Sequence, residues 1–107
     1  NAGADVRTVD GSGATTLWHA SGTPENGEAI RLLLTAGAEV EVADSQGVTP
    51  LMRAAELADT SQVVLLLDSG ASPTARGRDG RTALDRAKAR TDKHGLEIAA
   101  MLEQAGR

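Results

Sequence analysis

Apolar positions in the middle of the chain form short stripes that predict a pair of helices. The first stripe recurs at spacings of three, one and three, which marks one side of a helix: Leu51, Ala54, Ala55 and Ala58. Residues 63–67 follow as a continuous apolar run. This run predicts a second helix over 62–69, and a helix that is apolar nearly all round must be covered on more than one side.

Turn and cap residues separate these predicted helices. Gly47 allows a tight turn, and Thr49 can cap the first helix by accepting a hydrogen bond from its backbone. Pro50 stands at the first helical position, where the missing N–H costs nothing. Gly70 ends the second helix by adopting the left-handed conformation, and Pro73 prevents it from resuming.

The same pattern returns about every 33 or 34 residues. Gly13, Gly47 and Gly80 are separated by 34 and 33 residues. Three further series keep this spacing: Thr15, Thr49 and Thr82; Leu17, Leu51 and Leu84; Ala20, Ala54 and Ala87. A second set, out of phase with the first, matches residues 2–6 to residues 36–40. Recurrence at this period indicates a stack of similar units, each with two halves.

These motifs resemble the ankyrin repeat. The carrying residues are Asp44, Gly47, Thr49, Pro50, Leu51, Ala54 and Ala55, followed by Leu66, Leu67, Gly70 and Ala71. The resemblance covers the whole chain and implies an all-α solenoid of helix-loop-helix units joined by β-turn or hairpin fingers. It divides the chain into the tail of an upstream repeat (1–9), two repeats (10–43 and 44–76) and a C-terminal capping repeat (77–107).

The two ends of this stack differ. The last unit has a polar outer side, with Glu103 in its second helix and four charged residues in its first: Asp85, Arg86, Lys88 and Arg90. A polar outer side is typical of a cap. Residues 1–9 correspond to the turn after a helix pair, so we expect at least one further unit or cap upstream. Extra residues around 22–25 and 88–95 fall between the two helices of their units.

Composition narrows the function. The 107 residues carry a net charge of −4, which disfavours nucleic acid and anionic membranes as partners. No Cys is present, and Trp18 is the single aromatic residue, so the interior must be built from thin aliphatic layers. Residues 1–75 have net charge −7 and residues 76–107 have +3. The basic end is either a solvated cap or a surface for an acidic patch on a partner.

Candidate chemistry is weak. The segment Gly11, Ser12 and Gly13 lacks the Gly-Lys-Ser/Thr end of a phosphate loop. Glu39, Glu41 and Asp44 alternate along a turn, where solvation explains them better than a cation site. His19 and His94 lie in different units, so a histidine metal site is not expected. We therefore expect no enzyme activity, no metal and no cofactor.

A binding surface remains. The resemblance implies that partners bind the concave face made by the turn tips and the inner helices. The matching positions are Ser12, Gln46, Val48, Arg53, Glu56, Leu57, Arg78, Asp79, Arg81 and Arg90. Leu57 and Val48 are apolar where equivalent positions are polar or small, so they could form the centre of an interface. Two alternatives stay open: Leu57 folds back on residues 22–25, and Trp18 either packs between units or lies at the interface.

The sequence thus predicts a non-catalytic protein–protein interaction module in the cytoplasm, with no nucleic-acid or membrane partner. One alternative is an inhibitor or immunity protein that blocks a toxin or enzyme. Another is a targeting module fused to an upstream enzyme.

Overall fold

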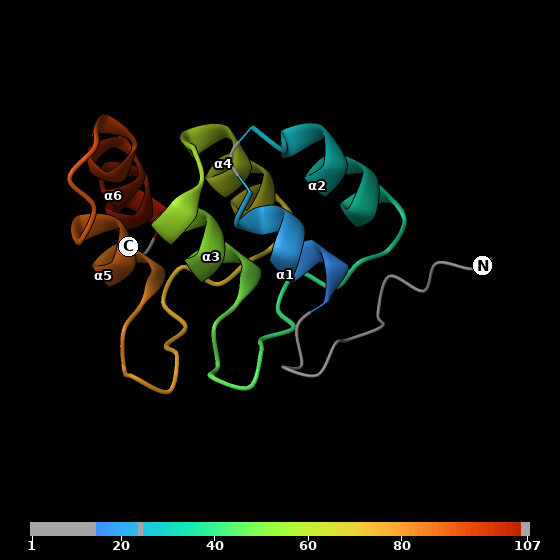
Figure 1. Ribbon diagram of the computed structural model, residues 1–107, viewed down its shortest axis with the longest axis horizontal. Coiled ribbons are helices and arrows are strands. Elements are labelled where there is room, and N and C mark those ends of the chain that lie inside the picture. The colour runs from blue at the N-terminus through green and yellow to red at the C-terminus, as the bar shows by residue number, and fades with distance from the viewer. Residues whose placement is uncertain (1–14, 24, 106–107) are drawn as a thin grey trace.

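The helices lie in two rows (Figure 1), in a computed structural model that describes residues 15–23 and 25–105. One row, the inner row, holds the first helix of each pair: α1 (Thr16–Ser21), α3 (Pro50–Leu57) and α5 (Ala83–Lys88). The other row holds the second: α2 (Gly27–Thr35), α4 (Thr60–Asp68) and α6 (Lys93–Ala105). The described residues contain no strand, which confirms the predicted all-α class.

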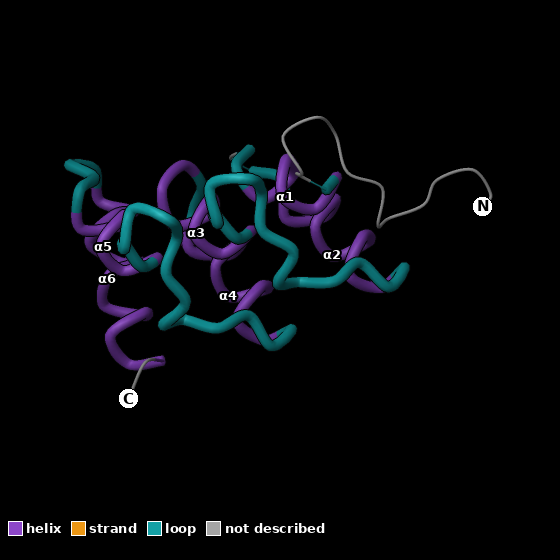
Figure 2. Tube along the Cα trace, turned by 90° about the horizontal axis from the view of Figure 1, so that it is seen from below, coloured by secondary structure: helices purple, strands orange, loops and turns teal. Residues whose placement is uncertain are grey.

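Each helix packs on its own partner and on the neighbouring pair. Helix α3 lies between α1 and α5, and α4 lies between α2 and α6. The loops that join successive pairs project from the same side of the stack, below the helices in Figure 1, and they lie in front of the helices in the view from below (Figure 2). This arrangement is an ankyrin-type solenoid, in which burial comes from neighbour-to-neighbour contacts. None of the helices in the described part of the chain is both long and apolar enough to span a membrane.

Threonine caps begin the helices of the inner row. Thr49 Oγ1 accepts from the backbone N–H of Met52 at 3.3 Å, and Pro50 is the first helical residue, as predicted. Thr15 and Thr82 cap α1 and α5 in the same way. The recurring threonine therefore fixes where each inner helix starts.

The second helix of the middle pair begins earlier than predicted. Instead of starting at residue 62, α4 starts at Thr60, because Asp59 caps it by accepting from the N–H of Gln62 at 3.2 Å. The prediction missed Asp59 because it placed the start of the helix next to the apolar run at residues 63–67. The helix ends at Asp68, one residue before the predicted end, and Gly70 adopts the left-handed conformation as predicted, with a φ of +98°.

Small aliphatic side chains fill the space between the rows. Fully buried residues include Leu17, Leu51, Leu66 and Ile98. Alanines allow the helices of neighbouring pairs to approach closely, and several of them are buried: Ala54, Ala55, Ala83 and Ala87. The interior thus consists of the thin layers that the ring-poor composition predicts.

Polar side chains also cross between pairs. Gln62 of α4 is fully buried; its Oε1 accepts from the N–H of Asn26 at 2.8 Å and its Nε2 donates to the carbonyl of Ser21 at 3.2 Å. Arg90, just after α5, donates to the carbonyls of Ala55 and Ala58 at 3.1 and 2.6 Å. In both cases a later pair satisfies carbonyl groups at the end of the preceding inner helix, where intrahelical donors run out.

The last unit was predicted to have a polar outer side carrying Asp85, Arg86, Lys88 and Arg90 on its first helix, and this is wrong for two of the four residues; the helix, α5, also ends at Lys88, before Arg90. Arg86 is 5 % exposed and turns toward the preceding finger, and the side chain of Arg90 is 14 % exposed and turns toward α3. Asp85 and Lys88 are exposed, as expected. The charge pattern alone could not distinguish the buried arginines from the exposed residues, because a long arginine side chain can reach carboxylates and carbonyls several residues away.

Candidate functional site

Two loops carry half of the predicted contact residues. We call them the Gln46 finger (residues 36–49, between α2 and α3) and the Asp79 finger (residues 69–82, between α4 and α5). Each tip is closed by a backbone hydrogen bond, from Asp44 N to Val48 O in one and from Gly77 N to Arg81 O in the other, both at 3.0 Å. The fingers are therefore ordered turns rather than open loops.

Aspartate side chains shape both tips. Asp44 Oδ1 accepts from the N–H groups of Gln46 and Val48, each at 2.9 Å, and Asp79 Oδ1 accepts from the N–H of Arg81 at 3.0 Å. A carboxylate that binds the backbone two residues ahead builds a turn of its own. The sequence analysis missed this role of Asp44. The available signal was the Asp three residues before the turn glycine in the first two units, Asp10 before Gly13 and Asp44 before Gly47.

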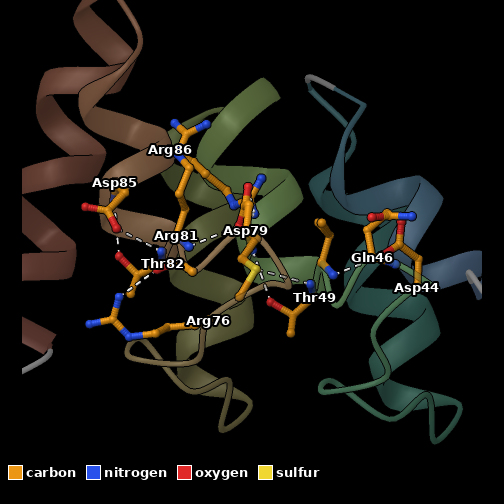
Figure 3. A network of polar contacts seen from close by, with 12 residues as sticks. Asp44, Gln46, Thr49, Arg76, Asp79, Arg81, Thr82, Asp85 and Arg86 are labelled. Carbon is orange, nitrogen blue, oxygen red and sulfur yellow. Dashed lines mark hydrogen bonds and ion pairs between the residues drawn. The ribbon is translucent and has the colours of Figure 1, made fainter.

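The two fingers are joined at their tips (Figure 3). The N–H of Arg78 donates to the carbonyl of Gln46 at 2.8 Å. Gly47, with a φ of +76°, stands close to this contact, and a Cβ there would lie 3.1 Å from Arg78 N. Behind the tips, Glu41 Oε2 accepts from the N–H of Ser72 at 3.0 Å. The tips thus form one continuous surface.

Arginine and aspartate hold the Asp79 finger against α5. The Nη2 of buried Arg86 donates to both carboxylate oxygens of Asp79, at 3.0 and 3.1 Å. Hydrogen bonding from the backbone of Arg81, together with the charge of Arg86, lowers the pKa of Asp79. The backbone N–H of Thr82 likewise lowers the pKa of Asp85. Both carboxylates are ionised at neutral pH, and each accepts a hydrogen bond from the backbone of the finger.

Acid should loosen this finger. A carboxyl whose pKa is lower in the folded than in the unfolded state stabilises the fold above its unfolded pKa of about 4, and this contribution is lost as the pH falls through the folded pKa. We expect the urea midpoint to drop when the pH is lowered from neutral to below about 4. The Asp79→Asn variant should lose less on acidification, because the titrating group is gone.

The matched control for this acid experiment is Asp68→Asn, which removes an exposed carboxylate at the end of α4. The comparison asks whether Asp79→Asn reduces the pH dependence of stability more than Asp68→Asn does. Equal pH dependence of the parent and Asp79→Asn proteins would contradict a stabilising role for ionised Asp79.

Trp18 and Arg53 form an interlocked group between the first two pairs. Trp18 Nε1 donates to the carbonyl of Val48 at 2.7 Å, and the Arg53 guanidinium lies 4.2 Å from the centre of the indole ring. A Cβ on Gly22 would lie 2.8 Å from Arg53 Nη2, so the guanidinium fills the space that this glycine leaves. His19 meets the indole edge-on at 5.0 Å. Trp18 is half-buried and packs between pairs, the first of its two predicted roles.

The two apolar candidates lie at opposite ends of α3. Val48 precedes the N-cap and packs partly against the core, whereas Leu57 is the last helical residue and is 41 % exposed. The rise of a helix of this length places them roughly 12 Å apart. They are therefore too far apart to form a single apolar patch, and they mark the two ends of a surface that runs along α3.

The structure distributes the predicted contact residues in three ways. Exposed on the fingers are Gln46, Arg78, Asp79 and Arg81, and on the far end of α3 lie Glu56, half-buried, and Leu57. The guanidinium group of Arg53 lies over the Trp18 ring, and that of Arg90 donates to carbonyls at the end of α3, so both are used in contacts inside the protein. Ser12 lies outside the described residues.

Other sites on the described part of the chain offer little chemistry. A pocket of about 380 Å³ lies beside α5 and α6, lined by Pro73, Thr74, Arg76, Thr82, Leu84, Asp85, Leu102 and Glu103, and it contains none of the predicted contact residues. Within residues 15–23 and 25–105, no cluster of His, Cys, Asp or Glu is arranged to hold a metal ion. The fingers and the end of α3 are therefore the candidate site.

Comparison with known proteins agrees with the architecture. A family model described as ankyrin repeats, in three copies, matches residues 2–77. No curated protein matches the chain.

Proposed function

This chain belongs to the ankyrin-repeat family, and from that premise we propose that it binds a protein partner through the fingers and the exposed end of α3. Ankyrin repeats are generally protein–protein interaction modules, and the family is typically non-catalytic. The observation that carries the proposal is a face of exposed side chains on a rigid support: Gln46, Arg78 and Arg81 on joined fingers, with Leu57 at the other end.

Leu57 is the apolar element of this face. A few fully desolvated residues near the centre of an interface contribute most of its binding energy, whereas charged groups contribute mainly specificity and association rate. Leu57 lies at the end of α3, on the middle pair of the stack, and it is 41 % exposed. A partner that spans the face from the fingertips along α3 would bury it.

Photo-crosslinking tests the proposal directly. A benzophenone amino acid in place of Leu57 should crosslink a protein from the source cells. The same group in place of Leu96, which is 73 % exposed on α6 in the other row, is the matched control and should not crosslink that protein. Leu57→Asp should reduce capture of the partner about tenfold or more, and Leu96→Asp should leave it unchanged.

The proposal is wrong if both positions crosslink the same proteins equally, or if Leu57→Asp retains the partner fully. The identity of the crosslinked protein separates the finer hypotheses. A toxin or enzyme inhibited by this chain would support an inhibitor or immunity role, and a substrate of an enzyme encoded upstream in the same protein would support a targeting role.

A further inference from the structure

The two fingers carry opposite charge. The Gln46 finger holds three acidic residues and no Lys or Arg: Glu39, Glu41 and Asp44. The Asp79 finger holds three arginines and a single acidic residue: Arg76, Arg78, Arg81 and Asp79. At equivalent positions 33 residues apart, Val48 gives way to Arg81 and Ser45 to Arg78. The surface therefore changes from acidic and apolar to basic between neighbouring fingers.

The acidic groups near the Asp79 finger are directed inward. Asp79 binds the Arg86 guanidinium and the N–H of Arg81, and Asp85 Oδ2 accepts from the N–H of Thr82 at 3.0 Å (Figure 3). Arg76 is partly engaged, since its Nη1 donates to the carbonyl of Gly80 at 2.6 Å.

The guanidinium groups of Arg78 and Arg81 differ from these neighbours. Both side chains are exposed at the tip, and among the described residues neither forms an ion pair within 4 Å. The charge of Arg81 still helps to lower the pKa of Asp79 and of Asp85. The positive charge of the finger is therefore presented outward, while its negative charge is used to hold the loop.

Resting on the proposed function, we infer that the partner presents an acidic polypeptide segment to the Asp79 finger, with Asp or Glu carboxylates bound by Arg78 and Arg81. Guanidinium groups match carboxylates in geometry and charge. The net negative charge of the Gln46 finger, with Glu39 exposed, disfavours carboxylates there, so we expect the carboxylates of the segment at Arg78 and Arg81 and its neutral or apolar side chains near Val48.

A titration with defined peptides tests this inference. The probe is a short synthetic peptide of alternating Glu and Leu, and its partner probe has Gln in place of each Glu. Backbone amide shifts of the ¹⁵N-labelled protein should change most over residues 76–82 with the Glu peptide. The Arg78→Gln/Arg81→Gln protein should bind it about fivefold more weakly, and added salt should reduce that difference.

The matched control removes the same charge elsewhere. Arg31→Gln/Lys93→Gln neutralises exposed groups on α2 and at the start of α6 and should leave affinity within about twofold. Equal weakening by the two double variants, or equal binding of the Glu and Gln peptides, would overturn the inference. A short DNA duplex that shifts residues 76–82 when the Glu peptide does not would also overturn it.

Failure of this inference is distinguishable from failure of the proposed function. If the protein crosslinked at Leu57 is retained fully by Arg78→Gln/Arg81→Gln, the binding face stands and the acidic segment is wrong. If Leu57 crosslinks nothing beyond the Leu96 control, the binding face itself is wrong.

Discussion

Replacing Gln62 by leucine is expected to lower the free energy of unfolding by about 2–4 kcal/mol, although the change makes a buried position more apolar. Gln62 is fully buried and serves two backbone groups of the preceding pair, the N–H of Asn26 and the carbonyl of Ser21. Leucine has a similar size but no polar atoms, so both groups would lose their partner. A buried polar group without a partner costs about 1–3 kcal/mol, which outweighs the added apolar contact.

Urea unfolding of the Gln62→Leu protein measures this loss. Amide hydrogen exchange adds a local readout, because the N–H of Asn26 should lose protection before the amides of α6 do. The control is Gln104→Leu on the exposed surface of α6, which should change stability by no more than about 0.5 kcal/mol. A Gln62→Leu protein as stable as its parent would show that these two hydrogen bonds do not hold the first pair to the second.

Gly95→Ala should destabilise the third pair by about 1–3 kcal/mol, opposite to the effect of this substitution in an open helix. Alanine is intrinsically the better helix former by about 1 kcal/mol. At this position, however, a Cβ would lie 2.5 Å from Arg90 Cβ and 2.9 Å from the carbonyl oxygen of Ala87. Both contacts are shorter than real Cβ atoms make, so α6 and α5 would have to separate.

Gly27→Ala is the matched control for Gly95→Ala. Gly27 also lies in a helix, α2, and a Cβ there meets Leu65 Cδ1 at an ordinary 3.5 Å. That variant should gain up to about 1 kcal/mol in urea unfolding. The close-packing argument fails if Gly95→Ala is as stable as the Gly27→Ala protein.

Periodicity predicted the architecture well because the recurring residues have the same structural role in every helix pair. Thr49 caps α3 and Gly70 ends α4. Both roles depend only on neighbouring backbone groups, so they can be predicted from the local sequence. The buried leucines and alanines follow from helical spacing. Such features depend on residues close together in the chain.

Contacts between pairs were harder to predict. In the sequence, Gln62 is a polar residue at the start of an apolar run, and Arg90 is a charged residue expected at the surface. In the structure, each donates to a backbone carbonyl more than 30 residues away. Arg53 stacks on Trp18 only because Gly22 leaves space for its guanidinium. Long side chains have several partners within reach, and only three-dimensional packing selects among them.

The same limit applies to the candidate site. The phase of the repeat placed Gln46, Arg78 and Arg81 on the fingers, and they are exposed there. It grouped Leu57 with Val48, although α3 separates them. Equivalent positions identify the face. Only the partners of Asp79 and Asp85 show which arginines form no ion pair with a described residue.

The hydrogen bond between Arg78 N and Gln46 O has a consequence for affinity. Two independent loops would each lose conformational entropy when a ligand fixed their separation, and that loss would subtract from the binding free energy. Here the spacing between the tips is set during folding. A macromolecule that touches both therefore meets a preorganised template, and its residence time should depend on the fit of its own side chains rather than on ordering these loops.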